Sequence, residues 1–425
     1  MAKNPLHVER ELHIPAPEGD AVYSHGCYTS AKGLSLLEVV RHEAMHVAAD
    51  GERHFYSRRI YRRRSEDNGR SWAEEPDEQR KDSRRLAGLH RDPPAIIPDQ
   101  RNDLLISLFC TYEVDPAEPM FAIGNLMQRT RRTFYQLSRN GGHTWSKPRQ
   151  VIDARSGYDE TNWAPGISCG TTGGHASGQA VFLPDGTLVM GFDVMHSEAP
   201  TQPGAPRDLS YYLTVVYGQA RLSRDGTALE WRFGDMIAVE FPKSAVGCCE
   251  PALAHLGGAR LLNTMRCQGY ESRGIYSTRY TTVSEDGGLT WGEPTPLAYD
   301  DGETVWTPAS VHAFFPSSAT GKTYLVANIL PGPVYHQTPR YPLAIAEFDT
   351  GRLCILRDTV QVIQDLPKGA PAERRYTNWG MYEERGSGDL ILTMPEQPKL
   401  MDFSAMSRAE DFTADCIRFR VRLAP

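Results

Sequence analysis

One short pattern recurs along the chain and limits the folds that are compatible with it. Residues 65–72 read SEDNGRSW, residues 138–145 read SRNGGHTW and residues 284–291 read SEDGGLTW. The second copy starts 73 residues after the first, and the third starts 146 residues later, which is twice 73. A fourth, degenerate copy, SRDGTALEW, occupies 223–231. Self-similarity at a fixed period predicts stacked or radially arranged units.

The residue types of this pattern suit a tight hairpin turn. A Ser or Asp side chain can accept hydrogen bonds from nearby backbone amides, and Gly adopts positive φ without steric cost. The closing Trp can bury a large ring against a neighbouring strand. We therefore expect each copy to connect two strands of one repeating unit.

A second repeat marks six further hairpins. Short apolar runs flank turn signals near Gly33, Arg101, Gly186, Gly258, Gly321 and Gly388. Each predicts strand, turn and strand. Six units in 425 residues give about 71 residues each, which suits a blade of four strands. The sequence therefore predicts an all-β fold, a six-bladed β-propeller that occupies residues 1–425 as one domain.

The composition of the chain excludes some classes of binding partner. The net charge of −7 creates no overall basic field, so we expect no nucleic-acid partner. No apolar run is as long as a membrane span and no signal peptide opens the chain, so we expect no membrane association and a cytoplasmic location, or secretion if the N-terminus was trimmed. The eight cysteines lack paired metal spacing and are interpreted as buried thiols.

The stretch VVRHEAMHVAADG contains His42-Glu43-x-x-His46. On a helix this spacing places two imidazoles on one face, where they could bind zinc. However, the stretch continues directly from the first predicted hairpin, and the corresponding stretches of the other units are strand pairs. We therefore interpret it as a strand and expect neither a metal nor a cofactor.

The first strand of each propeller blade lines the centre of the ring. In this sequence that strand precedes each of the six turns. Counting back about eight to twelve residues from each turn selects six polar or titratable side chains: His25, Asp92, His175, Glu250, His312 and Tyr376. Convergence of such groups predicts a functional site at the centre of the ring.

The recurring boxes resemble those of the sialidase superfamily, also called BNR or Asp-box proteins. The resemblance covers most of the chain and implies a six-bladed propeller. The segment EPALAHLGGARLLNTMR is similar to one that holds a catalytic Glu and, sixteen residues later, an Arg that grips the carboxylate of the sugar. Those positions are Glu250 and Arg266 here.

Other segments carry the remaining expected roles. RYTNWGMYEERGSGDLILTMPE resembles the segment that holds the nucleophile, here Tyr376, which the Glu would activate. TPRYPLAIAEFD resembles the piece with another carboxylate-binding Arg, here Arg340. Arg41 and Asp50 fit the order of an Arg followed by the acid/base carboxyl group. We include Trp379 among the substrate-binding candidates.

One departure concerns the first strand. Members of the superfamily begin it with Arg-Ile-Pro, whose Arg completes a clamp of three arginines, whereas this chain has YSHGCY with His25 nearest to that position. A His cannot reproduce the bidentate geometry of Arg on a carboxylate. Either another Arg substitutes in space, or the substrate differs.

The resemblance implies a sialidase-like glycoside hydrolase that acts on acidic glycans, with Tyr376 as nucleophile, Glu250 as base and Asp50 as acid. Two alternatives remain open. A lyase or rhamnosidase-type enzyme could use His25, His175 and His312 on uronate-containing glycans, because histidine titrates near neutrality. A glycan-binding propeller without catalysis is the third class.

Overall fold

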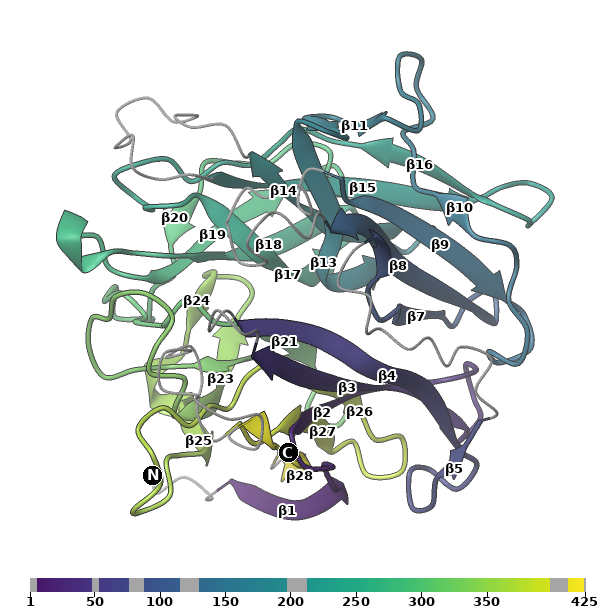
Figure 1. Cartoon of the computed structure of the whole chain (residues 1–425). Helices are drawn as coiled ribbons and strands as arrows, with labels where there is room; N and C mark the ends of the chain where they lie inside the picture. Colours follow the sequence, from purple (N-terminus) through teal and green to yellow (C-terminus); the bar gives the residue numbers. More distant parts are fainter. Residues whose placement is uncertain are drawn as a thin grey trace.

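Alternating apolar and polar residues between turn signals produce a structure built almost wholly of antiparallel strands. The computed structural model describes residues 6–47, 53–75, 88–114, 130–196, 212–397 and 412–423. Figure 1 shows the sheets arranged about a common centre, with blades 2, 3 and 4 in the upper half of the view and blades 1, 5 and 6 in the lower half. The predicted six-bladed propeller is confirmed.

The first three blades follow one another along the chain. Blade 1 contains β2 (Asp20–Tyr28), β3 (Leu36–Val47), β4 (Arg53–Ser65) and β5 (Ala73–Glu74). Blade 2 contains β6 (Gly88–Arg91), β7 (Ala95–Asp99), β8 (Leu104–Val114), β9 (Arg132–Ser138) and β10 (Arg149–Gln150). Blade 3 contains β13 (Thr172–Phe182), β14 (Leu188–His196), β15 (Tyr212–Leu222) and β16 (Leu229–Phe233). The hairpin of β11 (Asn162–Ala164) and β12 (Ile167–Ser168) lies between blades 2 and 3 in the sequence.

The remaining blades complete the ring. Blade 4 contains β17 (Cys248–Gly257), β18 (Arg260–Cys267), β19 (Thr278–Ser284) and β20 (Thr295–Pro296), with the 3-10 helix η1 (Glu271–Arg273) between β18 and β19. Blade 5 contains β21 (Ala313–Pro316), β22 (Thr323–Asn328), β23 (Leu343–Asp349), β24 (Cys354–Ile355) and β25 (Gln361–Gln364), with the 3-10 helix η2 (Arg357–Thr359) before β25. Blade 6 contains β26 (Gly380–Glu383), β27 (Leu390–Pro395), β28 (Cys416–Arg422) and β1 (His7–Ile14).

The two ends of the chain close the ring together. Strand β1, from the start of the chain, pairs antiparallel with β28, from its end, so that His7 lies opposite Arg422. The last blade therefore takes its outermost strand from the N-terminus. Because the strands of this blade come from both ends of the chain, their pairing holds the ring closed.

Both predicted repeats fall where the sequence placed them. The six hairpins join β2–β3, β7–β8, β13–β14, β17–β18, β21–β22 and β26–β27, and the first member of each pair is called the first strand of its blade. The four boxes join β4–β5, β9–β10, β15–β16 and β19–β20. In the first box, Asp67 Oδ1 accepts the backbone N–H of Ser71 at 2.8 Å, and Trp72 Nε1 donates to the carbonyl oxygen of Gly69 at 3.2 Å. Gly69 has a φ of 81°, the conformation for which the pattern requires Gly.

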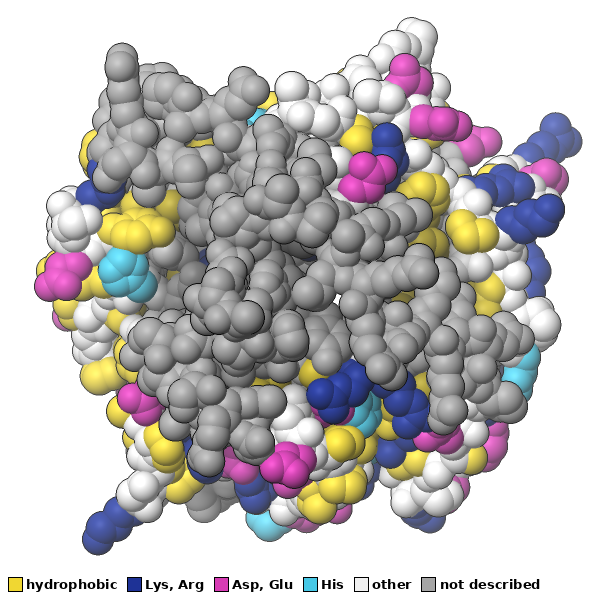
Figure 2. Space-filling view, viewed as in Figure 1, with side chains coloured by type: hydrophobic (Ala, Val, Ile, Leu, Met, Phe, Trp, Pro, Cys, Tyr) yellow, Lys and Arg dark blue, Asp and Glu magenta, His cyan; other side chains and the backbone are white. Residues whose placement is uncertain are grey.

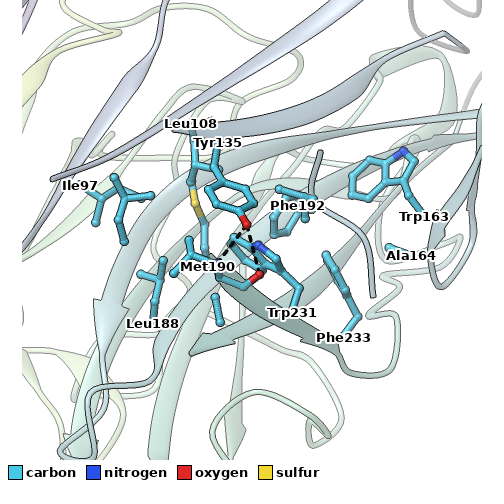
Figure 3. Close-up of a cluster of buried hydrophobic side chains, with 14 of the residues drawn as sticks. Ile97, Leu108, Tyr135, Trp163, Ala164, Leu188, Met190, Phe192, Trp231 and Phe233 are labelled. Atoms are coloured by element: carbon cyan, nitrogen blue, oxygen red, sulfur yellow. Dashed lines mark hydrogen bonds between the residues drawn. The ribbon is translucent and has the colours of Figure 1, made fainter. Parts of the chain in front are cut away.

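Large aromatic rings fill the space between neighbouring blades. In the cluster between blades 2 and 3, Trp163, Phe192 and Trp231 are almost completely buried (Figure 3). The ring of Phe192 meets both indoles edge-on, with centroids 5.9 Å and 5.7 Å away. The buried Tyr135 hydroxyl donates a hydrogen bond to the Leu229 carbonyl oxygen and accepts one from the Leu229 N–H. Figure 3 draws both hydrogen bonds. Such packing fixes the angle between blades and so positions the first strands.

The His-Glu motif forms part of a sheet. Residues 42 to 46 lie within β3, so the helix that a zinc site of this spacing requires is not formed there. His42 instead pairs its Nδ1 with Asp20 Oδ2 at 3.1 Å. In the part of the chain that the structure describes, no group of three or more His, Cys, Asp or Glu side chains is arranged to hold a metal ion.

Two other sequence features are also placed by the structure. The Arg run 58–64 lies in β4, and Figure 2 shows Lys and Arg side chains beside a histidine over the region of β3 and β4. Seven of the eight cysteines are buried and all eight are free thiols, as predicted. Within the described ranges, no helix is both long enough and apolar enough to cross a bilayer.

Candidate active site

The first strands of the blades meet at the centre of the ring, where β17 contacts β13 and β21, and β2 contacts β7 and β26. Glu250 lies in β17 with a φ of 48°, a left-handed conformation that costs energy in a residue with a side chain. Its backbone N–H donates to Asp193 Oδ1 at 2.9 Å, and its Oε1 accepts from Arg266 Nη1 at 2.5 Å. Glu250 and Arg266, the two residues that the resemblance selects in this hairpin, therefore form an ion pair.

The two carboxyl groups have different electrostatic surroundings. Burial favours the neutral form of Glu250, but the charge and hydrogen bond of Arg266 outweigh burial and lower its pKa. Burial, followed by the charge of Glu250, raises the pKa of Asp193 to about 7. His175 lies across the sheet from Asp193, with Nε2 3.7 Å from Oδ2, and burial lowers the pKa of this imidazole. Glu250 therefore carries charge while Asp193 can hold a proton near neutral pH.

Three other arginines near Arg266 are buried. Arg279, Arg340 and Arg375 expose 0%, 5% and 1% of their surface, respectively. Arg279 Nη2 donates to the carbonyl oxygen of Ser310 at 2.7 Å. Burial lowers the pKa of Arg279 to about 9, and burial followed by the charge of Arg266 lowers that of Arg340 to about 10. Within the described ranges, none of these three guanidinium groups forms an ion pair with a carboxylate.

Arg340 and Arg375 come from neighbouring blades. The two residues form a parallel β-bridge, and Arg340 Nη1 donates to Thr377 Oγ1 at 3.3 Å. All three side-chain nitrogens of Arg375 are buried and have no hydrogen-bond partner among the described residues. Burial, followed by the charge of Arg340, lowers the pKa of Arg375 to about 8. Unpaired buried donors are costly, so this guanidinium is available to an acceptor that the described residues do not supply.

A tyrosine from blade 1 lies beside the same arginines. Tyr23 exposes 4% of its surface, and its hydroxyl accepts a hydrogen bond from Gln397 Nε2. The guanidinium carbon of Arg41 lies 4.2 Å from the centre of the Tyr23 ring, and Arg41 Nη2 pairs with Glu43 Oε2 at 3.0 Å. Burial, followed by the charge of Glu43, raises the pKa of Tyr23, while Arg41 and Arg340 oppose this rise.

The remaining predicted polar residues surround this centre. His25 follows Tyr23 by two residues on β2 and has an exposed side chain. Desolvation by the surrounding protein atoms, followed by the charge of Arg41, lowers its pKa to about 4. Asp92 lies between β6 and β7, with Oδ2 3.7 Å from Arg131 Nη2. His312 is buried, and its Nε2 bonds the Thr264 carbonyl oxygen at 3.0 Å.

Two predicted residues lie in the core instead. Tyr376 is completely buried in the cluster between blades 5 and 6, and its hydroxyl donates to Glu396 Oε1 at 3.2 Å. Trp379 belongs to the same cluster. Successive residues of an extended segment point to opposite sides, so Arg375 and Thr377 face Arg340 while Tyr376 faces the core. These contacts place the Tyr376 phenol on Glu396 and not on Glu250. Asp50 lies outside the described residues.

Sequence reasoning missed three residues of this centre. Tyr23 shares a face of β2 with His25, so strand alternation could have found it. Arg375 directly precedes the predicted Tyr376, so counting back one more residue from the turn would have selected it. Asp193 lies on the second strand of blade 3, opposite His175. The residue pattern of the first strand alone does not reveal which residue of the second strand lies beside it.

The fold and this centre define a class, a six-bladed propeller of the sialidase type with buried arginines where its first strands meet. A family model described as BNR repeat-like domain matches residues 94–353. The chain therefore belongs to the BNR repeat-like domain family. A search of curated proteins found no match.

Solved structures of sialidases share this fold. A mutant of the NanB sialidase from Streptococcus pneumoniae superposes with a TM-score of 0.58 at 11% identity, covering 99% of this chain and 70% of that chain. The intramolecular trans-sialidase from Ruminococcus gnavus gives a TM-score of 0.55 at 11% identity, covering 95% of each chain. Trypanosoma rangeli sialidase gives 0.51 at 12% identity, covering 99% of this chain and 57% of that chain. At these identities the likeness extends to the fold.

Proposed function

We propose that this protein is a glycoside hydrolase that acts on a glycan containing a carboxylate sugar. The supporting observation is Arg375, whose buried guanidinium has no acceptor among the described residues and lies beside Arg340. Arg recognises carboxylates through parallel charged hydrogen bonds. Arg266, Arg340 and Arg375 would hold the carboxylate, and Arg375 would supply from blade 6 the guanidinium that the first strand lacks.

Tyr23 is the phenol that we assign to the chemical step. An ionised carboxylate nucleophile would be repelled by the carboxylate of the sugar, whereas a neutral phenol would not, and tyrosine serves as nucleophile in sialidases. The Tyr23 oxygen would bond to the anomeric carbon while its proton passes to a carboxylate. We assign this role to Glu43, which pairs with the Arg41 that lies over the Tyr23 ring, in place of Glu250, the base that the resemblance implies. The glycosidic C–O bond breaks, and water then cleaves the tyrosyl bond.

Two carboxyl groups complete the proposed site. Glu250 holds Arg266 in place through the 2.5 Å contact. We keep Asp50 as the predicted acid that gives a proton to the leaving oxygen. Glu250 also lies within electrostatic reach of Arg340, so its charge partly offsets the positive charge of the site before substrate binds.

The test is turnover by the purified full chain on fluorogenic sialosides, rhamnosides and uronides. We expect Tyr23→Phe to lose at least about 100-fold in kcat while substrate affinity changes less than about twofold. Tyr28→Phe is the matched control, because this tyrosine of the same strand bonds Asn68 instead. Full turnover by Tyr23→Phe would remove the assignment. Tight glycan binding without any turnover by the wild type would favour a binding module.

Elimination is a second candidate that one observation favours. His25 is exposed, follows Tyr23 on the same face of β2 and has a pKa lowered to about 4, so its imidazole is neutral and can accept a proton at pH 7. With a uronate polymer, elimination would yield an unsaturated product that absorbs near about 235 nm, whereas hydrolysis would not. Loss of that absorbance in His25→Ala with intact binding would support the lyase.

A further inference from the structure

Three aromatic side chains cluster at the surface of blades 4 and 5, where Tyr276 contacts each of the other two. The rings of Tyr276 and Tyr335 stack with centroids 4.6 Å apart and planes 24° apart. Trp306 meets Tyr276 edge-on at 5.5 Å. Tyr276 is 40% exposed, and the other two rings are partly exposed. We call these three residues the aromatic platform.

The platform lies on the side of the ring where the second strands end and the first strands begin. Tyr276 belongs to the connection from β18 to β19, and Tyr335 to the connection from β22 to β23. Trp306 lies in the connection from β20 to β21 and bridges Thr278. Arg266 stands next to the end of β18, and Arg340 shares the connection of Tyr335. The topology therefore places the platform and these arginines on one side.

Hydrogen bonds link the two arginines to residues of the connections that carry Tyr276 and Tyr335. Gln268 Oε1 accepts from Arg266 Nη2 at 3.4 Å and from Gln337 Nε2 at 3.4 Å. Gln337 Oε1 in turn accepts from Arg340 Nη2 at 3.1 Å. The two connections are also joined through their backbones, because the Ser277 N–H donates to the Val334 carbonyl oxygen at 2.7 Å. The platform and the arginines are therefore parts of one continuous structure.

We propose that the aromatic platform binds a neutral pyranose ring that is attached to the carboxylate sugar. The C–H face of a pyranose is apolar and packs on the flat faces of Tyr and Trp rings, while its hydroxyls need polar groups at the edge. His336 and Gln337, both beside Tyr335, supply such groups, and His336 is exposed. The inference rests on the proposed function, because the neutral sugar is attached to the one that Arg266 and Arg340 would hold.

The experiment compares matched ligands by calorimetric titration of the full chain. One pair is N-acetylneuraminic acid and 3'-sialyllactose, and the other is glucuronic acid and a glucuronate-terminated disaccharide. We expect the Tyr276→Ala, Tyr335→Ala double variant to bind the longer ligand about tenfold more weakly. Its affinity for the acidic monosaccharide should change less than about twofold.

Two further variants separate stacking from folding. The Tyr276→Phe, Tyr335→Phe variant keeps both rings and should retain wild-type affinity for the longer ligand. Val362→Ala alters an exposed apolar residue of β25 in blade 5 and should change neither affinity. If the double alanine variant loses affinity equally for both ligands, or keeps its affinity for the longer one, the proposed role of the aromatic platform is wrong. Neither result would contradict the proposed arginine site. A wild type that binds none of the acids would overturn the proposed function and this inference with it.

Discussion

The backbone N–H of Glu250 donates a hydrogen bond of 2.9 Å to the side chain of Asp193. The same Glu250 has a φ of 48°, a conformation that costs roughly 1–3 kcal/mol and persists only where its surroundings enforce it. Asp193 therefore connects blade 3 to blade 4 and helps to hold the strained segment that presents Glu250 to Arg266. Backbone strain of this kind is concentrated at functional sites.

Asp193 also makes stability depend on pH. Burial and Glu250 raise its pKa to about 7 in the folded protein, above the ordinary value of 3.8. The folded state therefore keeps a proton that the unfolded chain releases, so the wild type loses stability as pH rises towards 7 and levels off above it. Asn at this position keeps the acceptor but cannot ionise.

We therefore expect the free energy of unfolding of Asp193→Asn, relative to wild type, to increase between pH 5 and pH 7. The slope should reach at most about 1.4 kcal/mol per pH unit, and denaturant titrations at several pH values measure it. A difference that stays constant over this window would contradict the protonated Asp193.

Tyr376→Phe should keep its activity. The change removes the hydroxyl that bonds Glu396, at a cost of about 1 kcal/mol in the free energy of unfolding. Because the phenol points into the core between blades 5 and 6, kcat should stay within about twofold of wild type. Loss of turnover in a variant of normal stability would return the role of nucleophile to Tyr376.

The box at 284–291 should contribute to stability and not to chemistry. Asp286 Oδ1 accepts the Thr290 and Leu289 backbone N–H groups at 2.9 Å and 3.1 Å. Asp286→Ala should lower the free energy of unfolding by about 1–2 kcal/mol in thermal melts. Glu285→Ala, which removes only an exposed ion pair with Arg260, is the control and should cost less than about 0.5 kcal/mol. Equal effects of the two variants would show that the turn bonds contribute nothing.

Arg375→Met should stabilise the ligand-free protein. It replaces a buried guanidinium that has no acceptor among the described residues by an apolar side chain, which removes the cost of burying an unpaired charge. Differential scanning calorimetry without ligand measures the change in Tm. A large decrease would mean that the guanidinium supports the fold and is not held ready for a ligand.

The propeller could be predicted because its signals are local. A turn such as the one at Gly186 can be recognised from its own residues, and apolar and polar residues alternate with a period of two in the strands on either side. Glu250 and Arg266 could also be selected from the sequence, since both belong to the β17–β18 hairpin and to one motif of the superfamily. These relations need no knowledge of how the blades pack.

The rest of the site depends on exact register. An offset of one residue exchanges Arg375 for Tyr376, because neighbours on an extended segment face opposite sides. The placement of Tyr23 beside Arg340 depends on the closure of blade 1 against blade 6, through contacts between residues more than 300 positions apart. No local pattern in the sequence carries that information.

The most direct test of the proposed arginine site is to measure the affinity of the protein for a carboxylate sugar. Calorimetry should compare an acidic sugar with its uncharged methyl ester, on the wild type and on Arg375→Met. We expect the wild type to prefer the free acid by at least about tenfold, which corresponds to about 1.4 kcal/mol, and the Met variant to lose most of this preference. Equal affinity of the wild type for acid and ester, or an unchanged preference in Arg375→Met, would contradict a carboxylate site at these buried arginines.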